Sequence, residues 1–303
     1  MEGIFAVMFP SNCRICDEPL TRVSRLPVCQ DCLDGMRPMR GRLCSVCGER
    51  MLASSFSFSS SPTSLSGTES SGVAPEVAVL EDEPSPCPLC RRVAPAFAKA
   101  VAYGSYQGGL REMIHLLKYA NVFPAAKVLG RMVAQAIDGL EPLFGDGTIL
   151  VIPVPLHKSK RRQRGFNQAA LIAKAALKFH PAGRFHLAPN ILLRQRDTES
   201  QIAMTRNQRL ENLRGAFAIN RAGQVNDQVR DNEVLLVDDV LTTGATAAEC
   251  ARVLLKAGAS KVWVATAART LKLASNEEAK FQGFKVSEFQ GSNQTQSGGV
   301  IAS

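Results

Sequence analysis

The 303-residue sequence lacks the features of several protein classes. No apolar run approaches the roughly 20 residues that a membrane-spanning helix needs, so we expect no membrane partner. Residues 1–10 have no basic stretch before their short apolar run and do not indicate a secretory signal, which predicts a cytoplasmic protein. Aromatic residues make up only 6% of the chain, and no basic patch is interleaved with them, so base stacking on single-stranded nucleic acid has little support.

Histidine is absent from the region where cysteine is concentrated. Eight of the nine cysteines form four Cys-x-x-Cys pairs, and two such pairs offer the four thiolates that tetrahedral structural Zn²⁺ prefers. We therefore predict two all-cysteine zinc sites. Sequential pairing places Cys13, Cys16, Cys29 and Cys32 on one ion and Cys44, Cys47, Cys87 and Cys90 on the other. The sequence leaves a cross-braced pairing open.

Two other roles for these cysteines are less favoured. Disulfides would need an oxidising compartment, for which the sequence gives no sign. A redox role fits one reactive pair better than four similar pairs, which favour a scaffold. The ninth cysteine, Cys250, falls within a predicted helix and is expected to lie in the core.

Two stretches are too polar to form a packed core. Residues 54–71 are mostly Ser with Pro, Thr and Gly, and residues 76–83 are acidic, which predicts a disordered insertion over about 51–86 within the second zinc site. A long loop raises the cost of closure only logarithmically, so metal binding tolerates it. The composition divides the chain into a zinc module (1–95), an α/β domain (96–270) and a disordered tail (271–303).

The middle of the chain alternates strand and helix patterns. Apolar runs predict strands at 98–103, 148–154, 191–194, 215–219, 234–237 and 261–267. Helical spacing of apolar residues predicts helices at 108–119, 125–140, 167–179 and 247–257. Such alternation predicts an α/β fold, a parallel sheet with helices on both faces, whose ligands bind beyond the carboxyl ends of the strands.

The most informative stretch is residues 234–246. Asp238 and Asp239 stand where a buried strand should end, and a loop of small residues leads from them into a helix: Thr242, Thr243, Gly244, Ala245 and Thr246. The amino end of a helix attracts anions through its N–H groups and dipole. Two carboxylates repel a phosphate but accept hydrogen bonds from hydroxyls, so the pattern indicates a ribose 5-phosphate unit. The alternative is an ordinary strand with an acidic end and a Thr-Gly turn.

Positive charge is concentrated in one segment. Residues 155–214 hold 13 Lys and Arg against 3 Asp and Glu, whereas the whole chain has a net charge of +9. This predicts an anionic partner, either a polyphosphate or a nucleic-acid backbone. In the basic loop after the second strand, Arg161 and Arg164 are the first candidates for a diphosphate, with Lys158 and Lys160 in support. A solvated basic face is the alternative.

A third candidate is the polar stretch that follows residue 194. It contains Arg194, Thr198, Gln201 and Arg209 and has few apolar anchors. We expect a mobile loop that closes over a phosphorylated ligand and excludes water. An ordinary surface loop is the alternative.

Residues 234–246 resemble the signature of the type I phosphoribosyltransferases. The paired Cys-x-x-Cys module, Leu-Lys-Tyr at 117–119, Pro-Val-Pro-Leu-His at 153–157, Arg-Gly-Phe-Asn-Gln at 164–168 and the Asp-Asp loop occur in an order similar to that of the ComF family. These are amidophosphoribosyltransferase-like proteins linked to DNA uptake in natural competence. The resemblance covers roughly residues 1–50 and 87–270.

The resemblance implies a type I phosphoribosyltransferase-like domain at 96–270 behind a double zinc ribbon. It implies that phosphoribosyl pyrophosphate (PRPP) binds with Mg²⁺, its 5-phosphate on Thr242–Thr246, its ribose hydroxyls on Asp238 and Asp239 as the catalytic acids, and its pyrophosphate on the basic loop. It further implies a role in handling single-stranded DNA, with competence helicase proteins as partners. Two functions remain open: a glycosyltransferase-class enzyme with an unknown acceptor, and a non-catalytic module that binds single-stranded DNA and senses PRPP.

Overall fold

The computed structural model describes residues 11–20, 24–51, 85–197, 206–220 and 225–271. Most of the predicted insertion and all but the first residue of the predicted tail lie outside these ranges. In the part of the chain that is described, no helix combines the length and apolar character needed to cross a bilayer.

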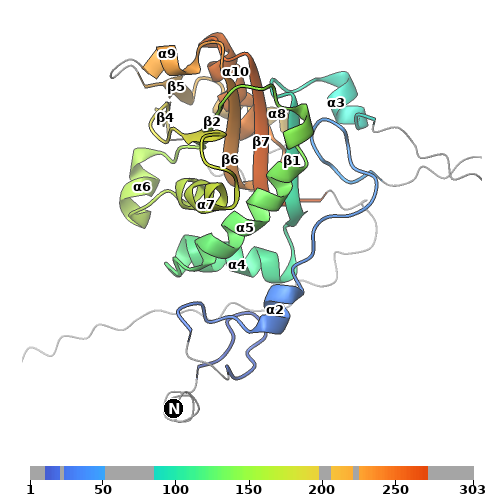
Figure 1. The fold of residues 1–303 in the computed structure, drawn as a ribbon, viewed down its shortest axis with the longest axis vertical. Coiled ribbons are helices and arrows are strands. Elements are labelled where there is room, and N and C mark those ends of the chain that lie inside the picture. Colours follow the sequence, from blue (N-terminus) through green and yellow to red (C-terminus); the bar gives the residue numbers. More distant parts are fainter. Residues whose placement is uncertain (1–10, 21–23, 52–84, 198–205, 221–224, 272–303) are drawn as a thin grey trace, which may run out of the picture. The chain divides into compact units, whose positions relative to one another are not determined.

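The fold is built on a five-stranded sheet in which every pairing is parallel. In spatial order its strands are β1 (Lys99–Ser105), β7 (Lys261–Arg269), β6 (Glu233–Leu241), β2 (Ile149–Pro153) and β3 (Phe185–Leu187) (Figure 1). The central strands are almost continuous apolar runs, as expected where both faces of a parallel sheet are covered. The predicted fold class is confirmed. The three-residue edge strand β3 was not foreseen.

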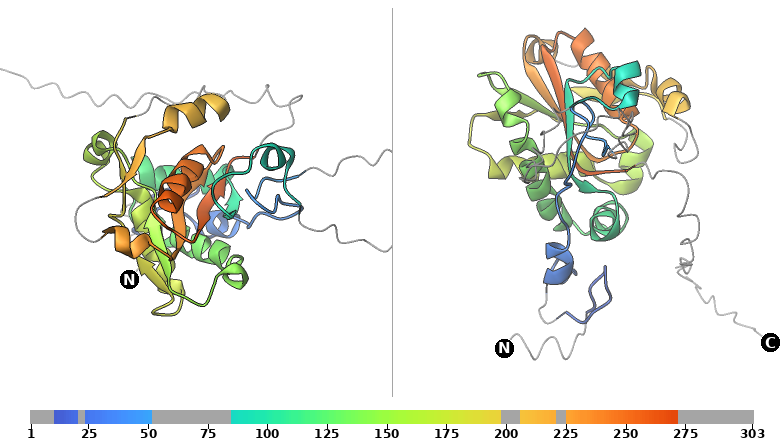
Figure 2. Two further views of the ribbon diagram at one scale, coloured as in Figure 1. Left: turned by 90° about the horizontal axis from the view of Figure 1, so that it is seen from above. Right: turned by 90° about the vertical axis from the view of Figure 1, so that its right-hand side faces the viewer.

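Different helices cover the two faces of the sheet (Figures 1 and 2). On one face, Leu235, Val237 and Trp263 share a core with α4 (Gly108–Tyr119), α5 (Ala125–Asp138) and α7 (Gln168–Ala176). On the other, Val234, Leu236 and Val264 pack with α10 (Ala245–Lys256). Two short 3₁₀ turns, η1 (Glu141–Leu143) and η2 (Leu177–Phe179), follow α5 and α7.

A small antiparallel sheet packs on the α10 side. It pairs β4 (Leu192–Arg194) with β5 (Phe217–Ile219), and α9 (Val225–Val229) follows. The two short strands were predicted, but their antiparallel pairing apart from the main sheet was not. Between the strands lies α8 (Arg206–Leu213), in a stretch predicted to be a polar loop. That prediction was wrong for residues 206–213, because the helix has an apolar anchor: Leu213 is completely buried in the core on this face.

The predicted basic loop is also partly helical. Residues 158–164 form α6 (Lys158–Arg164), where the His157 side chain accepts a hydrogen bond from the Ser159 N–H at the amino end. Gly165 ends the helix in the left-handed region, with φ of 80°. A polar cap and a left-handed glycine are the usual helix boundaries, but the seven charged and polar residues between them lack the apolar period that predicts a helix.

The central strand continues beyond the point where the sequence predicted its end. β6 includes Asp238 and Asp239 and runs on to Leu241, because β7 continues beside it and pairs Leu241 with Arg269. The helix that follows begins earlier than predicted, at Ala245. The two acids therefore lie inside a paired strand, and the loop between strand and helix is only three residues long.

Candidate functional site

Asp238 and Asp239 point to opposite faces of the sheet because neighbouring residues of a strand alternate. The Asp239 carboxylate is 5% exposed and lies on the side of α4 and α7. Asp238 is half-buried on the side of α10. The Asp239 backbone N–H donates to Asp238 Oδ1 at 2.9 Å. A ligand therefore meets two acids with different surroundings.

Asp239 already has a cationic partner. The Lys118 ammonium, at the end of α4, forms an ion pair with Asp239 Oδ2, and the Lys118 side chain is 16% exposed. The Gln168 side-chain amide donates to Asp239 Oδ1 at 3.3 Å. A ribose hydroxyl would have to share or displace these partners. Lys118 was missed as a site residue, and the only sequence signal for it was its place in the Leu-Lys-Tyr motif.

The charges around the two acids set their pKa values apart. Burial raises the pKa of Asp239, but the Lys118 ammonium and the hydrogen bonds with Asp238, Lys118 and Gln168 together hold the pKa below its usual value. Burial, and after it the Asp239 carboxylate, raises the pKa of Asp238 well above its usual value. A protonated carboxyl group donates a hydrogen bond and an ionised one accepts, so one acid of the pair can donate to a hydroxyl while the other accepts from a neighbouring hydroxyl.

The loop after the acids has the geometry of an anion site. Thr242 is exposed, and Thr243 and Thr246 are half-buried. Gly244 is the N-cap residue of α10, in the left-handed region with φ of 78°, and it supplies no side-chain hydrogen bond to the helix. Thr243 Oγ1 accepts a long hydrogen bond, 3.4 Å, from the Ala245 N–H. The uncapped amino end of a 12-residue helix thus lies at the carboxyl end of β6, where a phosphate would bind.

The basic residues of α6 fall into two groups. The side chains of Lys158, Lys160 and Arg161 are exposed. Arg164 is half-buried, and its Nη1 donates to Gln168 Oε1 at 2.6 Å. Its guanidinium also lies 5.6 Å from the centroid of the Tyr119 ring. Arg164 is thus connected through Gln168 to Asp239, whereas the exposed Lys158, Lys160, Arg161 and Arg162 remain available to a ligand.

The third predicted stretch is described only in part. Thr198 and Gln201 lie outside the described residues, and Arg209 belongs to α8. Arg194 is half-buried, with its guanidinium 5.5 Å from the centroid of the Phe217 ring, and burial lowers its pKa. The start of α6 is tied to this stretch, because Ser159 Oγ donates to Asp197 Oδ2 at 2.7 Å. The predicted closure over a ligand stays a prediction.

The cysteines form two clusters with the predicted sequential pairing, and the cross-braced alternative is excluded. The clusters are Cys13, Cys16, Cys29, Cys32 and Cys44, Cys47, Cys87, Cys90. Sulfurs bound tetrahedrally to zinc at about 2.3 Å lie about 3.8 Å apart. Two sulfur pairs match this spacing: Cys16 and Cys29 at 3.6 Å, and Cys47 and Cys87 at 3.8 Å. Both clusters fit structural zinc.

Metal analysis of the purified protein is expected to find about two zinc ions per chain, because each four-thiolate cluster holds one. The measurement is elemental analysis against protein concentration by amino-acid hydrolysis. A value near one would mean that only one cluster binds metal. Removal of Cys87 and Cys90 would then leave the value unchanged if that cluster is the first, and would abolish zinc binding if it is the second.

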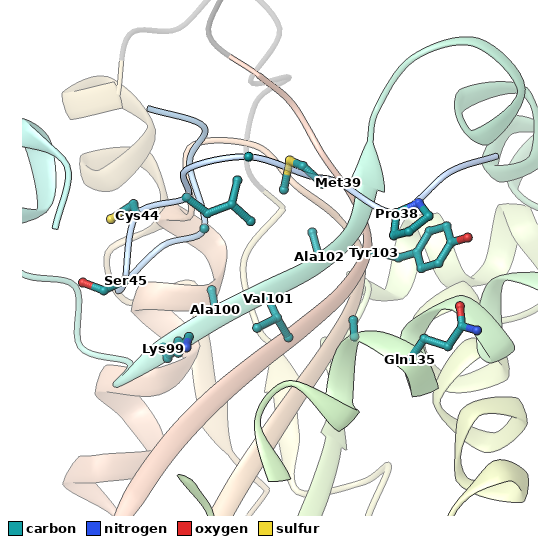
Figure 3. A pocket seen from close by; sticks show the side chains of 14 residues that line it. Pro38, Met39, Cys44, Ser45, Lys99, Ala100, Val101, Ala102, Tyr103 and Gln135 are labelled. Carbon is teal, nitrogen blue, oxygen red and sulfur yellow. The ribbon is translucent and has the colours of Figure 1, made fainter. Parts of the chain in front are cut away.

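One cavity among the described residues lies away from the acids. It has a volume of about 550 Å³ and is bounded by β1, the segment from Pro38 to Gly48, and Gln135 of α5 (Figure 3). A second cavity of about 340 Å³ touches the candidate loop at Gly244 and Ala245, between α8, α10 and residues 93–96. We place the candidate site by the acids and the helix end rather than by cavity size.

Comparison with known proteins identifies two families in the chain. Residues 4–62 match the double zinc ribbon domain, and residues 191–299 match the phosphoribosyl transferase domain. Cys87 and Cys90 lie beyond the first match, on the far side of the Ser-rich stretch. The division of the chain at residues 95 and 270 stays a prediction.

Similar whole proteins carry names that concern DNA. DNA utilization protein YhgH of Shigella flexneri is 31% identical over 61% of this chain and 78% of its own length. Competence protein F of Haemophilus influenzae is 29% identical over 59% of this chain and 76% of its own. A solved allosteric regulatory enzyme of purine biosynthesis aligns with 48% of this chain and 26% of its own at 24% identity, with a TM-score of 0.28, too slight a likeness to support any conclusion.

Proposed function

Because the chain belongs to the family of double-zinc-ribbon, phosphoribosyltransferase-domain proteins that includes Competence protein F and DNA utilization protein YhgH, we propose that it binds PRPP and acts on incoming single-stranded DNA. The observation that supports PRPP most is the adjacency of two acids and an uncapped helix end. Asp238 and Asp239 precede Gly244 by a few residues on one strand and loop. A ribose 5-phosphate has hydroxyls at one end, which would face the acids, and a phosphate at the other end, which would face the amino end of the helix.

In this proposal the residues have distinct roles. The N–H groups of residues 243–246 and the Thr hydroxyls hold the 5-phosphate. Asp238, which has no cationic side chain paired with it among the described residues, takes the first ribose hydroxyl, and Asp239 takes the second while Lys118 keeps it ionised. Catalysis would then consist of positioning and of electrostatic stabilisation as positive charge develops at the anomeric carbon.

The leaving pyrophosphate would lie toward α6. Lys158, Lys160 and Arg161 are exposed there, and an Arg fork matches phosphate oxygens bidentately. Arg164, committed to Gln168, would position Asp239 rather than bind the diphosphate. Mg²⁺ would accompany PRPP and offset part of its charge. Zinc clusters need reduced cysteine thiolates, which suits a reducing compartment, and we propose a cytoplasmic location.

An assay of PRPP turnover separates an enzyme from a sensor. The full-length protein with Mg²⁺ and PRPP is mixed with candidate acceptor bases or single-stranded DNA, and pyrophosphate release is measured. Release that depends on one acceptor supports a transferase. Saturable PRPP binding without release under any acceptor supports the non-catalytic module. If the protein shows no PRPP binding and no pyrophosphate release, the proposal is contradicted.

The alternative function, a non-catalytic module that binds single-stranded DNA, draws on the charge of α6. Its exposed side chains include Lys160, Arg161 and Arg162 in a helix with no acidic residue. Contacts of this kind with phosphates are independent of sequence and weaken as salt rises. The proposed DNA interface is therefore this helix.

Replacing Lys160, Arg161 and Arg162 by Ala is expected to weaken single-stranded DNA binding and to reduce the dependence of log Kd on log salt by up to about 2, since each lost phosphate contact contributes about 0.7. Fluorescence anisotropy between low and moderate salt measures both. A variant with Ala at Arg111, Lys127 and Lys256, three exposed basic residues on other helices, removes the same charge and is the control. Equal effects of the two variants would mean that α6 is not the interface.

A further inference from the structure

Arg269, the last residue of β7, connects the central sheet to the second cysteine cluster. Its side chain is buried, and Nη2 donates to Glu49 Oε2 at 2.6 Å. The same Nη2 lies 3.6 Å from Cys47 Sγ. Its Nε and Nη1 have no hydrogen-bond partner among the described residues. A buried guanidinium is thus satisfied chiefly by one zinc-type cysteine and by the acid two residues after it.

This contact matters most when zinc is bound. Four thiolates around Zn²⁺ have a net charge of −2, and an Arg N–H beside one sulfur offsets part of it. Groups that contact the ligands of a metal in this way orient them and tune their affinity for the metal. Among the described residues, Arg269 is a basic residue with a side-chain nitrogen at contact distance from a cysteine sulfur. That sulfur belongs to Cys47, in the second cluster.

The other end of Arg269 adjoins the candidate ligand loop. Arg269 pairs with Leu241 in the sheet, and the Thr270 N–H donates to the Leu241 carbonyl oxygen at 3.1 Å. Leu241 directly precedes Thr242, the first residue of the loop. The Arg269 carbonyl oxygen accepts a hydrogen bond from the Tyr106 N–H at 2.7 Å. The residue that touches the metal cluster therefore also fixes the strand ends from which the loop begins.

A second contact fixes the same knuckle to the sheet. The Ala100 N–H in β1 donates to the Val46 carbonyl oxygen at 2.7 Å. At Gly48, a Cβ would lie 3.0 Å from the Ala100 carbonyl oxygen, so the two backbones approach closely. Figure 3 shows Cys44 and Ser45 beside Ala100, on the segment that crosses β1. The second cluster is thus built against the edge of the sheet.

We propose that Arg269 is a positioning residue that stabilises zinc in the second cluster and couples its occupancy to the order of residues 242–246, the loop and the start of α10. With zinc bound, Cys47 and Glu49 hold the Arg269 guanidinium in place. Because Arg269 pairs with Leu241, the ends of β6 and β7 are then held in place too. Without zinc, the knuckle loses its shape and leaves a buried cation unpaired, which loosens these strand ends. The order of the loop is a property of the protein itself, whatever ligand it binds.

The first test is zinc transfer to a chelator from the full-length protein. In Arg269→Met, we expect one of the two zinc ions to be held about 10- to 100-fold more weakly than in wild type, which is the usual effect of losing a group that supports a metal ligand. The other ion should be held as in wild type. Arg269→Lys, which keeps the charge, should recover part of the loss. Arg252→Met removes another Arg–Glu pair, between Arg252 and Glu249 on α10, and should change neither ion.

Retention of both ions at wild-type strength in Arg269→Met would overturn the proposal. If that variant does not fold, by circular dichroism, Glu49→Gln replaces it, because Gln keeps the shape but leaves Arg269 without its carboxylate. Wild-type zinc retention in Glu49→Gln would then overturn the proposal.

The second test measures the coupling without any ligand. Hydrogen exchange of the amides at 242–246 is followed before and after the more weakly held zinc is removed. We expect exchange there to become at least about 10-fold faster, as a locally opened segment would, while amides of α5 stay unchanged. Unchanged exchange at 242–246 would overturn the coupling. Since no PRPP is present, this outcome is independent of whether the proposed function is correct.

Discussion

Changing Asp238 and Asp239 to Asn together is expected to weaken PRPP binding by at least about 100-fold, because each carboxylate hydrogen bond to a hydroxyl contributes about 1.5–3 kcal/mol. Asn keeps the size of each side chain but replaces one carboxyl oxygen by an NH₂ group, which cannot accept a hydrogen bond. Isothermal calorimetry with PRPP and Mg²⁺ measures the loss.

The variant needs a compensating change, since Asp239→Asn leaves the Lys118 ammonium buried without its partner. Adding Lys118→Met removes that charge, and the triple variant should regain stability while still failing to bind. Asp138→Asn with Glu141→Gln changes two exposed acids, at the end of α5 and in η1, by the same net charge as the double Asp238 and Asp239 variant and is the control for that variant. Wild-type affinity in the triple variant would mean that the acids do not hold the ligand.

Lys118→Met alone is expected to lower the free energy of unfolding by about 3–5 kcal/mol, the usual cost of removing one partner of a buried ion pair. The cost arises because Asp239 is left buried and charged. The double variant Lys118→Met with Asp239→Asn should be more stable than Lys118→Met. Urea denaturation measures all three proteins. Equal stability of wild type and Lys118→Met would mean that the pair is solvated.

The stability difference between wild type and Lys118→Met should depend on pH in a defined way. The pKa of Asp239 is lowered, so its contribution is present above its unfolded value of about 4 and is lost as pH falls through the folded value. Burial lowers the pKa of Lys118, but the Asp239 carboxylate with Asp238 and Tyr106 together raise it above its usual value, so its contribution is present below about 10.4 and is lost above the folded value. Denaturation curves should therefore differ most between about pH 5 and 9.

The sequence was informative where a function is encoded in consecutive residues. Asp238 to Thr246 could be interpreted because strand, acids, loop and helix follow one another, and a helix end is an anion site by geometry. The cysteine pairs were equally local, because a Cys-x-x-Cys knuckle places two sulfurs on one ion. Sequential pairing was favoured and is confirmed.

The sequence was least informative where tertiary contacts decide. Nothing near Lys118 indicates that it reaches Asp239, 121 positions later, because only the packing of α4 against the sheet brings them together. Arg269 and Glu49 are 220 positions apart, and a pattern of local residues cannot predict their contact. The helices α6 and α8 were missed because their sequences are charged and lack an apolar period.

The most direct test of the PRPP site is an NMR titration of the full-length protein with ribose 5-phosphate, read at the backbone amides. The largest shifts are expected at Thr243 to Thr246, with smaller ones beside Asp238. If the shifts instead cluster on β1 and the segment that carries Cys44, around the 550 Å³ cavity, or if no amide of the loop responds at saturating ligand, the sugar phosphate binds elsewhere and the account is wrong.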